Sequence, residues 1–150
     1  MSGRGAAAAV KCFVADLVGG SGSRPPSQQL SLDEPERVWV QGVAVASGGL
    51  SGGASEVRGF VLDDGTGLLP IDARKLPPLA PSSSLPSSTP SSMPCPLGAY
   101  VMVIGSVGRR EDGARVVVAA KLVDLSPDPN RESMWYLEVL DCAQHLARQQ

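Results

Sequence analysis

The feature that most constrains the fold is a series of short β-type segments, separated by glycine-rich turns, between residues 38 and 125. Within them apolar residues alternate with other types, which is the pattern that places every second side chain on the same face of a strand. In the first segment this period puts Val38, Val40 and Ala44 on one side. The predicted strands cover residues 38–46, 56–64, 68–76, 99–107 and 114–125. These strands predict an all-β domain.

The turns between the segments indicate how the strands connect. Gly42 inside the first strand indicates a bulge or a sharp bend. Residues 64–67, Asp-Gly-Thr-Gly, form a tight turn between the second and third strands, and residues 109–113 form a hairpin loop. Five short strands with an early glycine in the first and fourth predict a small closed Greek-key barrel. The five-stranded OB-fold is the main candidate.

Two stretches lack the strand pattern. Residues 77–98, between the third and fourth strands, hold seven prolines, seven serines and no charge, so we predict a long disordered loop rather than a helix. Residues 1–35 are predicted to be a flexible N-terminal segment with one short apolar element at 10–18, either an extra strand or a helical turn. The OB-fold domain then spans residues 36–148.

A helix is predicted at residues 131–148. Asp128 is its expected N-cap, and Pro129 follows at the first position, where its missing N–H costs nothing. Apolar residues then recur at spacings of i, i+4, i+7 and i+11, namely Trp135, Val139, Cys142 and Leu146. A second set flanks them on one side: Tyr136, Leu140, Ala143 and Ala147. Met134 and Leu137 interrupt the opposite, polar side. The apolar arc is wider than that of an ordinary surface helix.

This wide arc and a lysine in the last strand favour protein binding. A small barrel covers one side of a helix, so the remaining apolar surface is expected to contact another chain, which predicts a helix-mediated dimer. Trp135 either anchors this contact or docks on its own barrel. Lys121 either protects a strand edge or meets an acceptor on the partner. The predicted partner-binding residues are Lys121, Trp135, Val139, Leu140, Cys142 and Leu146.

The composition argues against catalysis and against metal or cofactor sites. Asp63 and Asp64 form an acid/base pair or a metal site in one interpretation, but turn aspartates ordinarily bond their own backbone. One histidine and three cysteines without ligand spacing do not make a zinc site, so the cysteines are expected to be buried or half-buried free thiols. No run of about 18 apolar residues exists, so we expect no membrane span and a soluble, intracellular protein.

Single-stranded DNA binding, of the replication-protein-A or telomere-capping type, is the alternative function. Such sites combine a basic groove with stacking aromatic residues. The whole chain has 13 basic and 15 acidic residues. Residues 36–128 contain eight basic and nine acidic residues. Only three of the six aromatic residues lie in the predicted barrel. Little direct nucleic-acid binding is therefore expected. The alternative predicts salt-sensitive oligonucleotide binding that depends on Arg58, Arg74 and Lys75.

Four stretches resemble the family of RecQ-mediated genome instability protein 2. They read VWVQGVAV, FVLDDGTG, YVMVIGSV and AAKLVDLSPDPNRESMWYLEV, and the resemblance covers roughly residues 38–76 and 99–141. It is most specific at residues 119–139, where a lysine strand, a turn and the start of a helix follow one another. The DDGTG hairpin is less specific, since other OB proteins have similar turns.

The resemblance implies a nuclear, non-enzymatic subunit. Its implied partner is the C-terminal OB domain of RecQ-mediated genome instability protein 1, and through it topoisomerase III alpha and a RecQ helicase. The implied role is to support double Holliday junction dissolution, non-crossover recombination and genome stability. In the family, the residues matching Lys121 and Trp135 lie at or beside the partner interface, and the OB core is a poor DNA binder. The first 37 residues and the Pro/Ser segment show no usable match.

Overall fold

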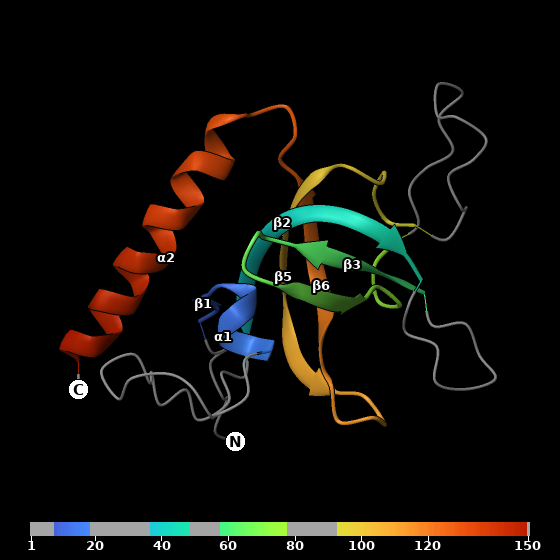
Figure 1. Ribbon diagram of the computed structural model, residues 1–150, viewed down its shortest axis with the longest axis horizontal. Helices are drawn as coiled ribbons and strands as arrows, with labels where there is room; N and C mark the ends of the chain where they lie inside the picture. Colours follow the sequence, from blue (N-terminus) through green and yellow to red (C-terminus); the bar gives the residue numbers. More distant parts are fainter. Residues whose placement is uncertain (1–7, 19–36, 49–57, 78–92, 150) are drawn as a thin grey trace, which may run out of the picture.

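A computed structural model describes residues 8–18, 37–48, 58–77 and 93–149 (Figure 1). Within these ranges six strands belong to one sheet, and five of them form a closed barrel. The elements in chain order are β1 (Val10–Lys11), α1 (Val14–Val18), β2 (Val38–Ser47), β3 (Gly59–Asp63), β4 (Leu68–Asp72), β5 (Tyr100–Arg109), β6 (Arg115–Asp124) and α2 (Asn130–Arg148).

The barrel closes because β2 pairs with two neighbours. Its first half is antiparallel to β5, and its second half is antiparallel to β3. The ring continues from β3 to β4, from β4 to β6 through a parallel pair, and from β6 back to β5. A small five-stranded barrel with this Greek-key order is an OB-fold. The fold class predicted from the sequence is confirmed.

Two glycines permit the tight strand approaches that this closure needs. A Cβ at Gly42 would lie 2.5 Å from the carbonyl oxygen of Asp63, and one at Gly105 would collide with the carbonyl of Val118. Any side chain at either position would therefore push neighbouring strands apart. A register shift lies between Ile104 and Gly105 in β5, where the glycine predicts a bend. In β2 the shift lies between Ala44 and Ala46, two residues beyond the bulge predicted at Gly42.

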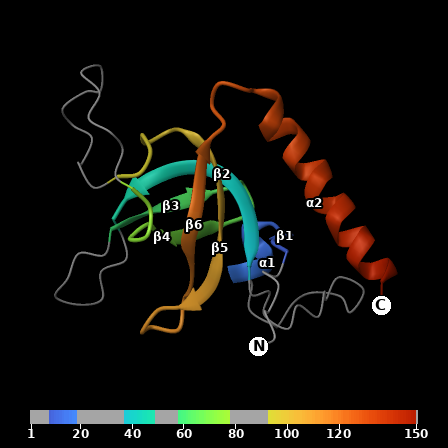
Figure 2. The ribbon, with the colours of Figure 1, turned by 180° about the vertical axis from the view of Figure 1, so that it is seen from behind.

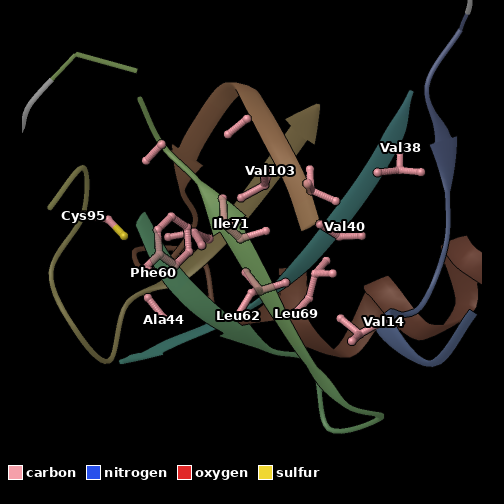
Figure 3. Close-up of a cluster of buried hydrophobic side chains, with 14 of the residues drawn as sticks. Val14, Val38, Val40, Ala44, Phe60, Leu62, Leu69, Ile71, Cys95 and Val103 are labelled. Atoms are coloured by element: carbon pink, nitrogen blue, oxygen red, sulfur yellow. The ribbon is translucent and has the colours of Figure 1, made fainter. Parts of the chain in front are cut away.

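The interior of the barrel is filled by apolar side chains from all five strands (Figure 3). Phe60, Leu62, Leu69 and Ile71 are fully buried on β3 and β4. Val38, Val40 and Ala44 of β2 form the inward side of that strand, which agrees with the period-two pattern. Burying one such side chain contributes roughly 1.5–3 kcal/mol.

The N-terminal apolar element forms both of the structures that the sequence left open. β1 pairs in parallel with β2, and α1 follows directly. Cys12, Val14 and Leu17 are buried in the same core cluster as the barrel residues. The predicted domain boundary between residues 35 and 36 falls outside the described residues, but residues 8–18 belong to the same structural unit as the barrel.

The end of the Pro/Ser segment is also part of this unit. Residues 78–92 lie outside the described residues. Met93 and Cys95, however, are 2% and 1% exposed within the core, and the Gly98 N–H donates to the Ala44 carbonyl at 2.8 Å. The prediction of disorder is therefore wrong for residues 93–98, because the sulfur-containing side chains in this stretch fill space at the end of the barrel.

The C-terminal helix begins close to its predicted start. The N-cap is Pro129, one residue after the predicted Asp128, and it has no side-chain cap hydrogen bond. The Asp128 carboxylate instead accepts a hydrogen bond from the Asn130 N–H at 3.2 Å. From there α2 runs along the outside of the barrel, beside β1 and β2 (Figure 2). In the described part of the chain, no helix is long and apolar enough to cross a membrane.

Candidate partner interface

The outer face of the sheet carries a row of side chains that leads from β1 to β6. Register places Lys11 opposite Trp39, Trp39 opposite Ile104, and Ile104 opposite Lys121. Directly paired residues project from the same face of a sheet, and this face is the outer one because Val40 and Val103, next to Trp39 and Ile104, are core residues. Lys121 is exposed at the β6 end of the row, and Ile104 is half-buried.

Helix α2 docks on the β1–β2 end of this row. The Trp135 ring stacks on the Trp39 ring, with centroids 6.3 Å apart and planes 26° from parallel. Glu138 forms an ion pair with Lys11 at 2.9 Å, and the Lys11 ammonium lies 4.6 Å from the centre of the Trp39 ring. This contact combines aromatic stacking, a cation–π interaction and a partly buried ion pair.

The side of α2 that faces away from the barrel carries large apolar side chains among its polar ones. Three of these are exposed: Met134, Leu137 and Leu140. Tyr136 is exposed as well, but its ring contacts the ring of Phe13 in the same chain. Leu137 is the most open of them, with 59% of its surface exposed. The expected excess of apolar surface on this helix is confirmed. We refer to Met134, Leu137 and Leu140 as the outer face of α2.

The six predicted partner-binding residues divide into three groups. Trp135 and Val139 are buried against the chain's own β1 and β2, with 4% and 3% exposure. Cys142 and Leu146 are half-buried, whereas Leu140 and Lys121 are exposed. Of the two alternatives for Trp135, the structure shows docking on its own barrel, and Val139 shares this position. The partner-binding role of the set stays a prediction.

The predicted set leaves out two residues of the outer face, Met134 and Leu137, which the sequence pattern marks only as interruptions of the polar side. Their signal was present, since apolar residues on the polar side of an amphipathic helix indicate a second contact surface. The sequence pattern does not indicate which side of the helix faces the barrel.

Asp63 and Asp64, at the turn between β3 and β4, accept hydrogen bonds from the backbone of that turn. The Asp63 carboxylate accepts the Gly65 N–H at 2.8 Å, and the Asp64 carboxylate accepts the Thr66 N–H at 2.8 Å. Gly65 has a φ of 83°, a conformation that glycine adopts without strain. Within the described ranges no three His, Cys, Asp or Glu residues form a group that could hold a metal ion. The turn interpretation of these aspartates is confirmed.

The cysteines are free thiols, as expected. Cys12 and Cys95 are buried and Cys142 is half-buried. Burial, with a smaller contribution from nearby Asp16, raises the pKa of Cys12 to about 12. Burial likewise raises the pKa of Cys95 to about 11. Both thiols therefore stay protonated at neutral pH and act as apolar core groups.

Two of the three basic residues of the DNA-binding alternative, Arg58 and Arg74, are engaged within the chain. The Arg58 guanidinium donates to the Leu76 carbonyl at 2.7 Å, and Arg74 forms an ion pair with Asp72 at 2.6 Å. Burial raises the pKa of Asp72, but the hydrogen bonds and charge of Arg74 outweigh this, and the pKa is lowered. Arg58 and Arg74 thus stabilise the turn that follows β4, and Lys75 is exposed beside them.

Comparison with known proteins places the chain in a family. The family model of RecQ-mediated genome instability protein 2 matches residues 8–143. The protein of that name from Bos taurus is 31% identical over 134 residues, covering 87% of this chain and 73% of the relative. Its Gallus gallus counterpart is 30% identical over 147 residues, covering 93% of this chain and 94% of the relative.

Among solved structures, a chain from the crystal structure of the S. pombe Stn1–Ten1 complex is similar, with a TM-score of 0.52. It is 16% identical, and the match covers 75% of this chain and 74% of that chain, so it supports the OB-fold alone. The sequence matches extend from β1 through most of α2 and include both the row of side chains and the helix that docks on it. The chain belongs to the family of RecQ-mediated genome instability protein 2.

Proposed function

We propose that this chain is a non-catalytic OB-fold subunit of a nuclear complex that contains a RecQ helicase and topoisomerase III alpha. In this complex it binds the C-terminal OB domain of RecQ-mediated genome instability protein 1. Through that contact it supports double Holliday junction dissolution, crossover suppression and genome stability. Family membership supports the complex, and the outer face of α2 supports the mode of binding.

The observation that carries the proposal is the two-sided character of α2. One side docks through Trp135 and Val139, while Met134, Leu137 and Leu140 remain exposed on the other. An apolar helix face of this kind fits an apolar helix or groove of a partner. Leu137 and Leu140 are three residues apart, and so are Met134 and Leu137, which is the spacing of neighbours along a helix surface.

The polar edge of the proposed interface is Lys121. It is exposed on the outer face of the sheet, one strand beyond Ile104. A partner that covers the outer face of α2 and extends over β5 and β6 brings an acceptor to this ammonium. A charged residue at the rim of an apolar contact contributes more to orientation and association rate than to affinity.

A non-catalytic role is supported by how the carboxylates of the hairpin are used. Asp63 and Asp64 accept hydrogen bonds from their own turn, and Asp64 also accepts the Val14 N–H at 2.8 Å. Their lone pairs therefore support the backbone. The chain's proposed contribution is to stabilise the complex and to offer a docking surface.

The test is co-expression with the C-terminal OB domain of RecQ-mediated genome instability protein 1, followed by size-exclusion chromatography. We expect a complex of one copy of each chain that survives moderate salt, because the contact is mainly apolar. The same preparation is titrated with a single-stranded oligonucleotide. Failure of the two proteins to co-elute, together with tight and salt-sensitive oligonucleotide binding, would replace the proposal with the single-stranded DNA-binding alternative.

A further inference from the structure

The N-terminal residues 8–18 connect two distant parts of the molecule. At one end they are fixed to the β3–β4 hairpin: Asp64 accepts the Val14 N–H at 2.8 Å, and the Thr66 hydroxyl accepts the Ala15 N–H at 3.0 Å. Gly67 leaves room for this contact, since a Cβ there would lie 3.2 Å from a methyl group of Val14. Val14 and Leu17 are buried in the core cluster.

Two residues earlier in the same segment, Lys11 and Phe13, contact α2. Lys11 forms its ion pair with Glu138, and the Phe13 ring lies 5.0 Å from the Tyr136 ring, centroid to centroid. Figure 1 shows β1 and α1 between the barrel and the second half of α2. Lys11 and Phe13 are half-buried, and Lys11 lies between Trp39 of the barrel and Glu138 of the helix.

Direct contact between α2 and the barrel is narrow by comparison. Of the 19 residues of α2, Trp135 and Val139 are buried, and the main contacts of the helix are with β1 and β2. A helix held at two buried positions can pivot about them. The contacts at Glu138 and Tyr136 flank Trp135 on both sides of the helix, which removes that freedom.

We propose that residues 8–18 act as a brace that sets the orientation of α2 on the barrel, with Lys11 and Phe13 as positioning residues for the partner surface. The brace fixes the direction in which Leu137 and Leu140 project, although Lys11 and Phe13 are not part of the outer face of α2. Asp64, on the β3–β4 hairpin, then influences partner binding through the brace. This inference rests on the proposed function for its binding consequence, but the bracing itself does not.

The first measurement is hydrogen–deuterium exchange of the full chain alone, read for α2 and for β2–β6 separately. Phe13→Ala and Lys11→Met are compared with the conservative Lys11→Arg. Because the ion pair and the ring contacts are each partly exposed, we expect amides of α2 to exchange on the order of fivefold to tenfold faster in the first two variants. Exchange in the barrel strands should be unchanged, and Lys11→Arg should restore most of the protection.

The hairpin supplies a matched pair of variants. Asp64→Ala removes the acceptor of the Val14 N–H and of the Thr66 N–H, whereas Asp63→Ala removes only a bond within the same turn, from the Gly65 N–H. We expect faster exchange in α1 and α2 for Asp64→Ala only. Equal exchange of α2 in both variants, or in wild type and Phe13→Ala, would overturn the bracing.

The second measurement is affinity for the OB domain of the partner. A loss of about fivefold in Phe13→Ala and Lys11→Met, with recovery in Lys11→Arg, would support the coupling to binding. Unchanged affinity despite a loosened α2 would overturn that coupling. If wild type itself does not bind, the proposed function fails, while the exchange data still decide whether the brace exists.

Discussion

The barrel and the attachment of α2 are held together by different kinds of contact. The barrel interior is continuous and apolar, with Phe60, Leu62, Leu69 and Ile71 completely removed from solvent. The attachment of α2 instead combines a stacked tryptophan pair, an ion pair and a tilted aromatic contact, all of them partly exposed except for Trp135 and Val139. We therefore expect the loss of a contact in the barrel to destabilise all five strands, and the loss of one in the attachment to loosen the helix alone.

This difference indicates how the molecule separates stability from recognition. A closed barrel tolerates little change in its core, because interiors are close-packed. A helix attached through few contacts can lose or gain a partner without unfolding the domain that carries it. The surface that we propose for binding lies on the element that contributes least to the barrel.

The largest expected effect is that of Phe60→Ala, which breaks the barrel. Removing this fully buried ring leaves a cavity, and we expect a loss of about 4 kcal/mol in the free energy of unfolding. Urea denaturation followed by circular dichroism gives the value. Because α2 needs the barrel for its docking, protection of α2 should be lost with it. A barrel that unfolds while α2 stays protected would contradict the dependence described above.

Trp135→Ala should separate the two regions. The change removes the stacking partner of Trp39, and we expect docking of α2 to weaken by about 3 kcal/mol while the barrel strands keep their protection. The chain has two tryptophans, so the fluorescence of the variant reports Trp39 alone. Its emission should shift to longer wavelength as solvent reaches the ring. An unshifted spectrum would mean that something other than α2 covers Trp39.

The Asp72–Arg74 ion pair after β4 predicts that the stability of the barrel depends on pH. The docking of α2 does not involve this pair. Arg74 lowers the folded-state pKa of Asp72 below its ordinary 3.8, so the pair stabilises the fold above that value, and the contribution is lost as pH falls through the lowered pKa. Arg74→Ala should therefore be less stable than wild type at pH 7, with a difference that shrinks toward pH 2. A difference independent of pH would show that Arg74 acts through packing instead.

The smallest expected effect on stability is that of truncating the outer face of α2. Leu137 is 59% exposed, and Leu68 at the start of β4 is 58% exposed, which makes them a matched pair. Both Leu137→Ala and Leu68→Ala should change the free energy of unfolding by less than about 0.5 kcal/mol. Thermal or urea denaturation of the two variants checks this. A loss well above that value for Leu137→Ala would show that this side chain packs within its own chain.

The same contrast explains what could be predicted from the sequence. The barrel strands follow a period of two, and their glycines and turn residues are local signals, so the OB-fold and the five strands were predictable. The helix was predictable from its period, although its N-cap is Pro129 rather than the predicted Asp128. The buried Met93 and Cys95 were not, because a proline-rich stretch gives no periodicity from which burial can be inferred.

Most contacts of α2 could not be predicted from local sequence patterns. Lys11 and Glu138 are 127 positions apart, and no pattern in either segment connects them. The wide apolar arc predicted two contact surfaces on the helix but not which of them faces the barrel. For that reason Trp135 and Leu140 were grouped together, although one is buried and the other exposed. Tertiary contacts decided the direction.

The affinity of the Leu137→Ala/Leu140→Ala double variant for the OB domain of RecQ-mediated genome instability protein 1 is the most direct test. It is measured beside wild type and Leu68→Ala by titration calorimetry. If the outer face of α2 is the partner surface, the double variant should lose on the order of 2 kcal/mol or more in binding, about 30-fold, while Leu68→Ala binds as wild type does. Equal affinities for all three proteins would contradict an interface on this helix.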